Sequence, residues 1–264
     1  MLPEIIVFGQ TINTFLILFL AGIIAGNWSF ARNVRKRLKA NELQLILIQA
    51  GLVLVFLLGG MMGSVVLYGT SVSAVGGYTI VGSIIVMALA TPLVARAVGL
   101  SGRGRMLADL VSVAFIPTQA IGKLGCLLAG CCYGTPWESP LAITYPEGSP
   151  APHGIHLHAV QLYEAVVLMG LWLICRRMLQ KNYAAGVVTG VFLIGKGCER
   201  FLTEPLRGDT VMTETGISTA QLASLVCIVA GLIYILFRKR GATEMPAFSM
   251  QGPAHAPAHT QGLD

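Results

Sequence analysis

Four positively charged residues interrupt stretches of the chain that are otherwise almost wholly apolar. They are Lys123, Lys196, Arg200 and Arg207. An ionisable side chain inside a membrane-spanning segment costs about 2.5–3.5 kcal/mol on insertion scales, so each one indicates a functional role. Lys and Arg at the depth of lipid headgroups can bind an anion, and the planar guanidinium of Arg can hold a phosphate through two parallel hydrogen bonds. The chemistry that these residues indicate is therefore phosphate binding.

Acidic and polar side chains are expected at the same depth as the cations. The acidic ones are Glu164, Glu199, Glu204 and Asp209. His158, Gln161 and Glu164 follow one another at intervals of three residues, which predicts that they share one side of a helix. Two interpretations stay open. In the first, ion pairs lock the bundle together, for example Lys123 with Glu164, or Glu199 with a neighbouring helix. In the second, the residues form an outward-facing site that binds an anionic headgroup.

The segment Gly122-Lys123-Leu124-Gly125-Cys126 favours the second interpretation. Glycines beside a cation let backbone amides approach an anion closely.

Three of the six cysteines lie close together in the sequence, at Cys126, Cys131 and Cys132. Three roles are open for them: packing as small apolar side chains, a redox-active or nucleophilic thiol site, and metal binding. Their spacing matches no standard zinc site, so no metal is predicted. The other three are expected to act as small hydrophobic residues: Cys175, Cys198 and Cys227.

The composition places all of these residues in a membrane protein. Of 264 residues, 55% are hydrophobic and only 11% are charged, against about 25% charged in ordinary soluble domains. The mean hydropathy is +0.73, so there is too little polar surface to cover the apolar mass in water. The net charge of +6 would suit a nucleic-acid binder, but the positions of the basic residues relate to membrane topology, and no nucleic-acid partner is predicted.

Seven stretches are long enough to form helices of about 20 residues that cross a bilayer. They are residues 5–28, 43–68, 78–98, 107–129, 158–175, 184–202 and a stretch within 215–237. The predicted fold class is an all-α membrane protein with seven transmembrane helices. The fourth stretch contains Pro117 and Lys123 and is expected to kink or break there.

Fourteen of the 18 lysines and arginines follow the first, third, fifth and seventh stretches. They are Arg32, Arg35, Lys36, Arg37, Lys39, Arg96, Arg103, Arg105, Arg176, Arg177, Lys181, Arg238, Lys239 and Arg240. Because cytoplasmic loops carry excess Lys and Arg, the N-terminus is predicted outside and the C-terminus in the cytoplasm. The four remaining cations are those first described, and Lys123, Arg200 and Arg207 then lie toward the outer ends of their helices.

Two segments are expected outside this bundle. Residues 1–240 form the transmembrane domain. Within it, residues of about 134–157 are expected to form a small external cap between the fourth and fifth helices. This segment contains five prolines, Trp137 and a strand-like run at 141–145. Residues 241–264 are rich in Ala, Pro, Gly, Gln and His and are expected to be a disordered cytoplasmic tail.

Several motifs resemble those of the prolipoprotein diacylglyceryl transferase family. The first comprises Asp109-Leu110, Ile116-Pro117 and the segment from Gly122 to Gly134. The second is His158-Ala159-Val160-Gln161-Leu162-Tyr163-Glu164, and the third joins residues 190–195 with Glu199-Arg200-Phe201, Glu204 and Arg207-Gly208-Asp209. Gly59-Gly60 with Tyr68, and Gly76-Gly77, are similar more loosely. The resemblance covers about residues 59–237.

The resemblance implies transfer of a diacylglyceryl group from phosphatidylglycerol to a prolipoprotein cysteine thiol, with release of glycerol phosphate, at the outer leaflet of the bacterial plasma membrane. No cofactor is implied. The implied catalytic residues are His158, Glu164 and Arg200. The implied substrate-binding residues are Lys123, Gly125, Gln161, Tyr163, Glu204, Arg207 and Tyr68. Cations near the departing phosphate would stabilise its charge, and His158 or Glu164 would serve to deprotonate the thiol.

The sequence also departs from the family pattern. Lys123, Cys126 and Cys131 replace Arg, Asn and Glu, Val75 stands at the position of the catalytic His, and the second-helix Arg falls at Met61 or Met62. Asn13-Thr14-Phe15 stands where the first helix of the family has a tyrosine. Another histidine, such as His153, His156 or His158, or one of the clustered cysteines then enters the chemistry, or the acceptor differs. Alternative functions are a non-catalytic lipid-binding accessory protein and, in the absence of quinone, haem or nucleotide motifs, less favourably a membrane thiol oxidoreductase.

Overall fold

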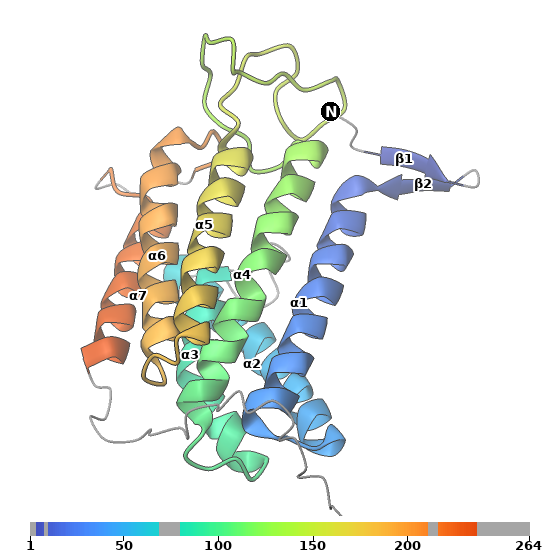
Figure 1. Ribbon diagram of the computed structural model, residues 1–264. Helices are drawn as coiled ribbons and strands as arrows, with labels where there is room; N and C mark the ends of the chain where they lie inside the picture. Colours follow the sequence, from blue (N-terminus) through green and yellow to red (C-terminus); the bar gives the residue numbers. More distant parts are fainter. Residues whose placement is uncertain (1–3, 8–9, 69–79, 211–215, 237–264) are drawn as a thin grey trace, which may run out of the picture.

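The protein is a bundle of helices that run side by side, with an irregular cap at one end (Figure 1). The computed structural model describes residues 4–7, 10–68, 80–210 and 216–236. The helices in this part are α1 (Thr14–Leu38), α2 (Glu42–Tyr68), α3 (Ile80–Ala97), α4 (Gly104–Ala129), α5 (Val160–Gln180), α6 (Val187–Thr203) and α7 (Thr219–Leu236). A short 3₁₀ helix, η1 (Glu204–Leu206), follows α6, and two strands, β1 (Glu4–Val7) and β2 (Gln10–Asn13), precede α1.

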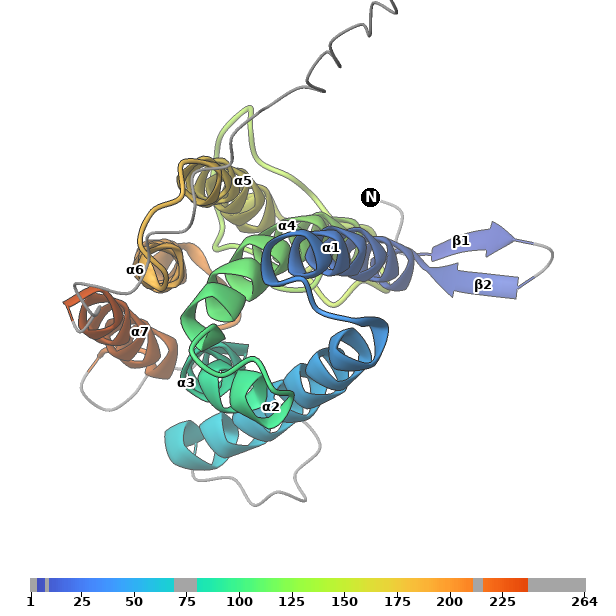
Figure 2. The same cartoon turned by 60° about the horizontal axis from the view of Figure 1, so that its bottom comes forward.

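Helix α4 lies at the centre of the arrangement. It packs against α1 on one side and α5 on the other, and it also touches α3 and α6. The pairs α2 with α3 and α6 with α7 complete the bundle, as the view from the opposite end shows (Figure 2). Residues on α4, α5 and α6 are therefore brought together within the bundle.

The outer surface of the bundle is apolar. Five helices, α1 to α4 and α7, are long and apolar enough to cross a membrane. Large hydrophobic side chains are exposed on several of them, for example Leu16, Ile24, Val66, Leu89 and Val229. Such a surface suits lipid and not water, so the chain is a multi-pass membrane protein. Helix α6 has 17 residues and carries charged side chains.

The predicted first span, residues 5–28, is wrong at its beginning. Strands β1 and β2 form an antiparallel hairpin in which Glu4 pairs with Asn13 and Val7 with Gln10. Helix α1 starts only at Thr14, where the Asn13 side chain accepts a hydrogen bond from the Phe15 amide at 2.9 Å, as N-cap residues do. No charged residue lies between Ile5 and the start of α1, so an uncharged stretch of sequence includes both the second strand and the helix. The other predicted spans agree with α2 to α7 to within five residues at each end.

The fourth helix was predicted to kink or break at Pro117 and Lys123, and no break occurs, because α4 continues through both residues. The Thr118 hydroxyl donates to the Ala114 carbonyl at 3.3 Å and to the Gly22 carbonyl of α1 at 3.0 Å. Neighbouring polar side chains of this kind satisfy backbone groups near a proline in a transmembrane helix. The unbroken α4 carries Lys123 to the cap end.

The start of α6 is fixed to α4 by a buried carboxylate. Asp109 accepts hydrogen bonds from the Gly186 amide at 2.8 Å, the Thr189 amide at 2.8 Å and the Thr189 hydroxyl at 2.7 Å. A carboxylate is stabilised there by the free amides and the positive end of the helix dipole. This contact sets the position of α6 along α4.

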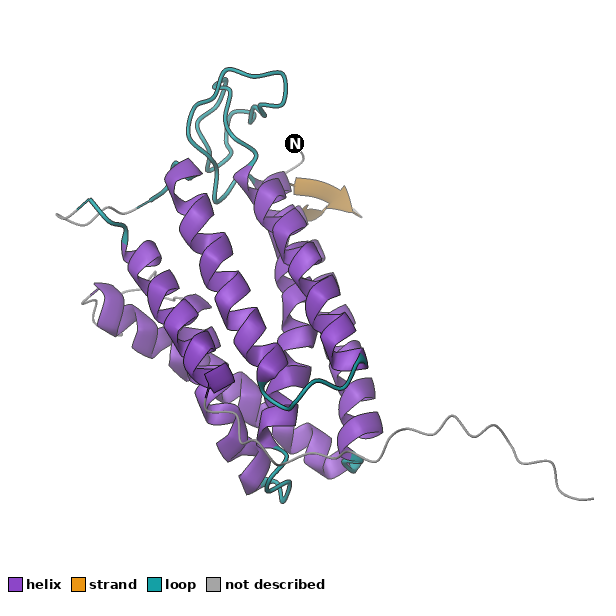
Figure 3. Ribbon diagram, turned by 60° about the vertical axis from the view of Figure 1, so that its left-hand side comes forward, coloured by secondary structure: helices purple, strands orange, loops and turns teal. Residues whose placement is uncertain are grey.

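The cap covers the ends of α4 and α5 and is irregular throughout (Figure 3). The predicted strand-like run at 141–145 forms only single bridges, of Ile143 with Leu157 and of Tyr145 with His153. The five prolines remove backbone donors, which limits regular pairing. Two backbone hydrogen bonds of 2.9 Å, from Thr135 to Leu206 and from Gly208 to Tyr133, tie the cap to the end of α6.

Glycines allow α6 and α7 to pack closely. A Cβ atom on Gly231 would lie 2.7 Å from the Gly190 carbonyl oxygen and 3.0 Å from the Ile194 nitrogen. We expect Gly231→Ala to lower the free energy of unfolding by about 1–3 kcal/mol, the usual cost of overpacking. Thermal unfolding in detergent measures this change.

Gly170 of α5 provides the matched control, because a Cβ atom there meets nothing within 4 Å. Gly170→Ala is expected to leave the unfolding temperature unchanged or to raise it, since Ala favours the helix. Equal effects of the two substitutions would contradict the packing assigned to Gly231.

Candidate functional site

A network of buried ion pairs joins α4, α5 and α6 at the cap end of the bundle. Its centre is Glu164 of α5, whose side chain is 0% exposed. Glu164 pairs with Lys123 of α4. Its Oε1 atom lies 3.4 Å from Arg200 Nη1 and 3.7 Å from Arg207 Nη1. One carboxylate is thus shared by three cations that sequence reasoning placed at the same depth.

Arg200 and Arg207 each have a second carboxylate, and a fourth cation, Lys196, pairs with a carboxylate of its own. Arg200 Nη2 lies 2.7 Å from Glu204 Oε2, and Arg207 Nη2 lies 2.7 Å from Asp209 Oδ2. Lys196 Nζ lies 2.6 Å from Glu199 Oε2. The predicted pairing of Glu199 with a neighbouring helix is wrong. Glu199 pairs within its own helix, because the spacing of three residues brings its side chain next to that of Lys196. The predicted pair of Lys123 with Glu164 is confirmed.

Arg207 has hydrogen-bonding capacity that the described part of the chain does not use. Its side chain is 7% exposed, and its Nε and Nη1 atoms have no hydrogen-bond partner among the described residues. Burial lowers the pKa of Arg207, but the adjacent Cys132, Glu164 and Asp209 outweigh burial and raise it. Arg207 is thus a permanent cation with free donors, and leaving such donors unsatisfied is costly.

Gln161 connects α5 to the cap. Its side chain is fully buried, and Nε2 donates to the Cys131 carbonyl at 2.8 Å and to the Tyr145 hydroxyl at 3.1 Å. Burial raises the pKa of Tyr145 to about 12, although the Gln161 hydrogen bond opposes this shift. Gln161 lies one helical turn from Glu164, so it orients the cap over the ion-pair network.

His158 does not lie on the helix face predicted for it. Helix α5 begins at Val160, so the three-residue spacing does not apply to His158. Its ring stacks on Trp137, with centroids 4.3 Å apart and planes at 9°, and meets Tyr163 edge-on at 6.2 Å. Within the described ranges, no hydrogen bond or ion pair joins His158 to the network. His153 and His156 are exposed in the cap.

Gly125 allows α4 to pack closely against α1. A Cβ atom there would lie 3.2 Å from the Phe15 ring and 3.3 Å from the Phe15 backbone. The side chain of Tyr68 and the whole of Val75 lie outside the described residues.

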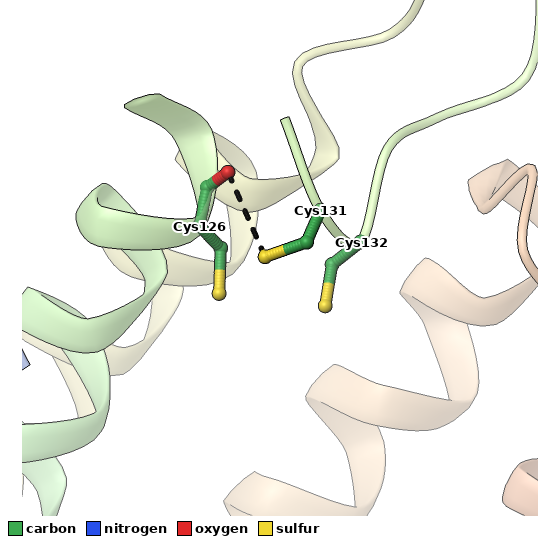
Figure 4. A group of neighbouring side chains, drawn as sticks. All are labelled: Cys126, Cys131 and Cys132. Carbon is green, nitrogen blue, oxygen red and sulfur yellow. Dashed lines mark hydrogen bonds between the residues drawn. The ribbon is translucent and has the colours of Figure 1, made fainter. Parts of the chain in front are cut away.

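The clustered cysteines come together in space beside the network. The sulfur atoms of Cys126, Cys131 and Cys132 all lie within 4.8 Å of one another (Figure 4), and all three cysteines are free. Hydrogen bonds from the other two thiols, together with the charges of Lys123 and Arg207, lower the pKa of Cys132. Of the other cysteines, Cys175 and Cys227 are buried as small apolar side chains, whereas Cys198 is exposed on α6.

Two residues that contact the predicted site residues were not predicted from the sequence. The Thr203 hydroxyl lies 3.4 Å from Glu164 Oε1, and Tyr145 bonds Gln161. Thr203 stands one turn beyond Glu199, so its position on α6 was a usable signal. No sequence signal places Tyr145, because its contact depends on the fold of the cap.

These features define a helical membrane protein with a buried, charge-balanced site at one end of its bundle. The chain belongs to the prolipoprotein diacylglyceryl transferase family, whose model matches residues 3–237.

Individual members of this family are similar to parts of the chain or to most of it. A phosphatidylglycerol–prolipoprotein diacylglyceryl transferase of Clostridium tetani is 35% identical over 124 residues, which is 47% of this chain and 50% of the relative. A second, from Clostridium perfringens, is 34% identical over 139 residues, or 52% of this chain and 54% of the relative. The chain thus spans about half the length of these two. One from Methylocella silvestris is 28% identical over 254 residues, or 87% of this chain and 90% of the relative.

Proposed function

We propose that the protein transfers the diacylglyceryl group of phosphatidylglycerol to the cysteine thiol of a prolipoprotein and releases glycerol phosphate. Membership of the family and the names of the relatives support this reaction. The observation that carries it is the buried guanidinium of Arg207, whose Nε and Nη1 atoms have no hydrogen-bond partner among the described residues. Hydrogen bonds from such charged N–H groups to phosphate oxygens are short and strong.

The reaction needs a group that stabilises a departing phosphate. When the carbon–oxygen bond of the glyceryl group breaks, negative charge develops on the phosphate, and donors fixed in a site that excludes water stabilise it most. Arg207 supplies free donors, and Lys123 and Arg200 pair with the same carboxylate, Glu164. We assign Arg207, Lys123 and Arg200 to the phosphate, with Glu164 and Glu204 as the carboxylates that hold the cations in place.

We also propose that all seven helices cross the plasma membrane of a bacterium, with the N-terminus and the cap outside and the C-terminus in the cytoplasm. Basic residues from separate connections meet at the end of the bundle opposite the cap, where Arg103 donates to the Leu38 carbonyl at 2.7 Å and Arg37 to the Leu179 carbonyl at 3.0 Å. The positive-inside rule makes this end cytoplasmic. The site then faces the outer leaflet. Residues 1–240 form the transmembrane domain in this proposal. The predicted tail at 241–264 lies outside the described residues.

A second candidate function is a lipid-binding accessory protein without turnover. The observation that favours it is the balance of the network, in which the four cations are matched by four carboxylates (Glu164, Glu199, Glu204 and Asp209).

Purified protein, phosphatidylglycerol and a peptide with a single cysteine distinguish the two candidates. If the protein is a transferase, the mass of the peptide increases by one diacylglyceryl group. A control peptide with Cys→Ser should remain unmodified. Binding of phosphatidylglycerol without modified peptide would favour the accessory function and contradict the transferase.

A further inference from the structure

The turn after α4 brings three thiols to one point. Helix α4 ends at Ala129, and both Gly130, with φ 79°, and Cys132, with φ 57°, adopt left-handed backbone conformations. The chain therefore folds back, so that Cys131 and Cys132 meet Cys126 on the last turn of the helix (Figure 4). A left-handed conformation is uncommon for a residue other than glycine and indicates a local constraint. Here it holds the sulfur of Cys132 in the cluster.

The separation of the sulfur atoms suits a single metal ion. Zinc binds thiolates at about 2.3 Å in a tetrahedron, which corresponds to sulfur–sulfur separations of about 3.8 Å. The three sulfur atoms lie within 4.8 Å of one another, so small rotations bring them to this distance. We infer that Cys126, Cys131 and Cys132 bind one Zn²⁺ and leave its fourth position open to the thiol of the acceptor. The second part of this inference rests on the proposed function.

The charges around the cluster favour such a complex. Three thiolates and one Zn²⁺ have a net charge of −1. Lys123 and Arg207 both interact electrostatically with Cys132, so two cations adjoin the anionic complex. The same two cations belong to the ion-pair network, which places the metal site directly beside the proposed phosphate site.

The fourth position of the metal is free in the described part of the chain. The group of possible ligands there consists of the three cysteines and contains no histidine or carboxylate. Zinc sites that have three protein ligands and one exchangeable position are typical of catalysis, whereas structural zinc sites have four protein ligands. The sequence spacing alone predicted no metal; the convergence of the sulfur atoms reverses that expectation.

A zinc ion with an open coordination position would deprotonate the acceptor thiol, which the ion-pair network does not do. A thiol must lose its proton before it attacks carbon. Each carboxylate of the network already pairs with a cation, so none of them is a free base. A metal ion deprotonates a thiol that coordinates to it. The acceptor thiol would bind Zn²⁺ as a thiolate and release its proton to water.

In the transfer step, one bond forms as another breaks. The zinc-bound sulfur forms a carbon–sulfur bond with the glyceryl carbon as the carbon–oxygen bond to the phosphate breaks. The electron pair of that bond leaves with glycerol phosphate, whose charge Arg207 stabilises. The metal neither gains nor loses electrons, so the step needs no oxidant or reductant.

Metal analysis of the purified protein tests the site without reference to activity. We expect one zinc ion per chain in the parent and in Cys198→Ser, whose thiol is exposed on α6, and loss of the metal in Cys131→Ser. Cobalt in place of zinc should give thiolate-to-cobalt charge-transfer absorption in the parent and in the control only. A folded parent that binds neither metal after incubation with its salt, and whose three cysteines all react as free thiols, would overturn the site.

Transfer assays test the role of the metal. Removal of zinc by a chelator should lower transfer by at least about 100-fold, since a metal that activates a nucleophile supplies several kcal/mol, and added zinc should restore it. The acceptor peptide, but not its Cys→Ser form, should change the cobalt spectrum. Transfer that is undiminished in the metal-free protein or in Cys131→Ser would overturn this role. A zinc-loaded protein that transfers no lipid would instead overturn the proposed function and leave the zinc site standing.

Discussion

Arg207→Met is expected to lower kcat/KM for diacylglyceryl transfer by about 10²–10³-fold, the cost of removing one donor that stabilises a developing anion. The loss should fall mainly on kcat, because the phosphate gains charge as its bond to carbon breaks. Met retains much of the length of the side chain and removes the donors Nε and Nη1, which have no partner among the described residues. Arg207→Lys should recover only part of the activity, since a Lys ammonium is a point charge and cannot donate from the separate positions of Nε and Nη1.

Arg35→Met is the matched control. Arg35 also pairs with a carboxylate, Glu42 at 2.8 Å, but both side chains are exposed and lie at the other end of the bundle. Exposed pairs contribute about 0–1 kcal/mol, so this variant should keep parental activity. Initial rates of peptide modification at several phosphatidylglycerol concentrations measure both variants. Parental kinetics for Arg207→Met would contradict the assignment of this residue to the phosphate.

Glu164→Ala should destabilise the protein by about 3–5 kcal/mol, as expected when one partner of a buried ion pair is removed. The substitution leaves Lys123, Arg200 and Arg207 without their shared carboxylate. The cations are largely buried, so water replaces that charge poorly. The apparent unfolding temperature in detergent measures the loss, and Glu42→Ala, at an exposed ion pair, should shift it little.

A second substitution separates lost charge from lost packing. Lys123→Met in the Glu164→Ala background removes an unpaired cation, so it should recover part of the stability, and the double-mutant cycle gives the coupling between the two residues. Equal unfolding temperatures for Glu164→Ala and Glu42→Ala would contradict the central place of Glu164 in the network.

Most of the helices could be predicted from sequence because each apolar stretch has the length that a bilayer requires. The fourth helix, for example, was predicted to end at Ala129, and α4 does end there. The hairpin before α1 could not be predicted in this way. No charged residue lies between Ile5 and the start of α1, so the uncharged stretch continues across the boundary, and the N-cap at Asn13 marks where the helix begins.

The network was predictable in part for a physical reason. Charges are costly in lipid, so the few that occur in spans must meet, and Lys123 and Glu164 do pair. The positions of His158 and of the three cysteine sulfurs were not predictable, because they depend on where α5 begins and on the left-handed turn at Cys132. Neither feature has a pattern in the sequence.

The proposed transfer is best tested by measuring the release of glycerol phosphate from phosphatidylglycerol together with modification of a cysteine peptide by the purified protein. We expect equal amounts of the two products in the parent, and neither product above background when the peptide carries Ser in place of Cys. Modified peptide without glycerol phosphate, or no product from a folded, zinc-loaded parent that binds phosphatidylglycerol, would contradict it.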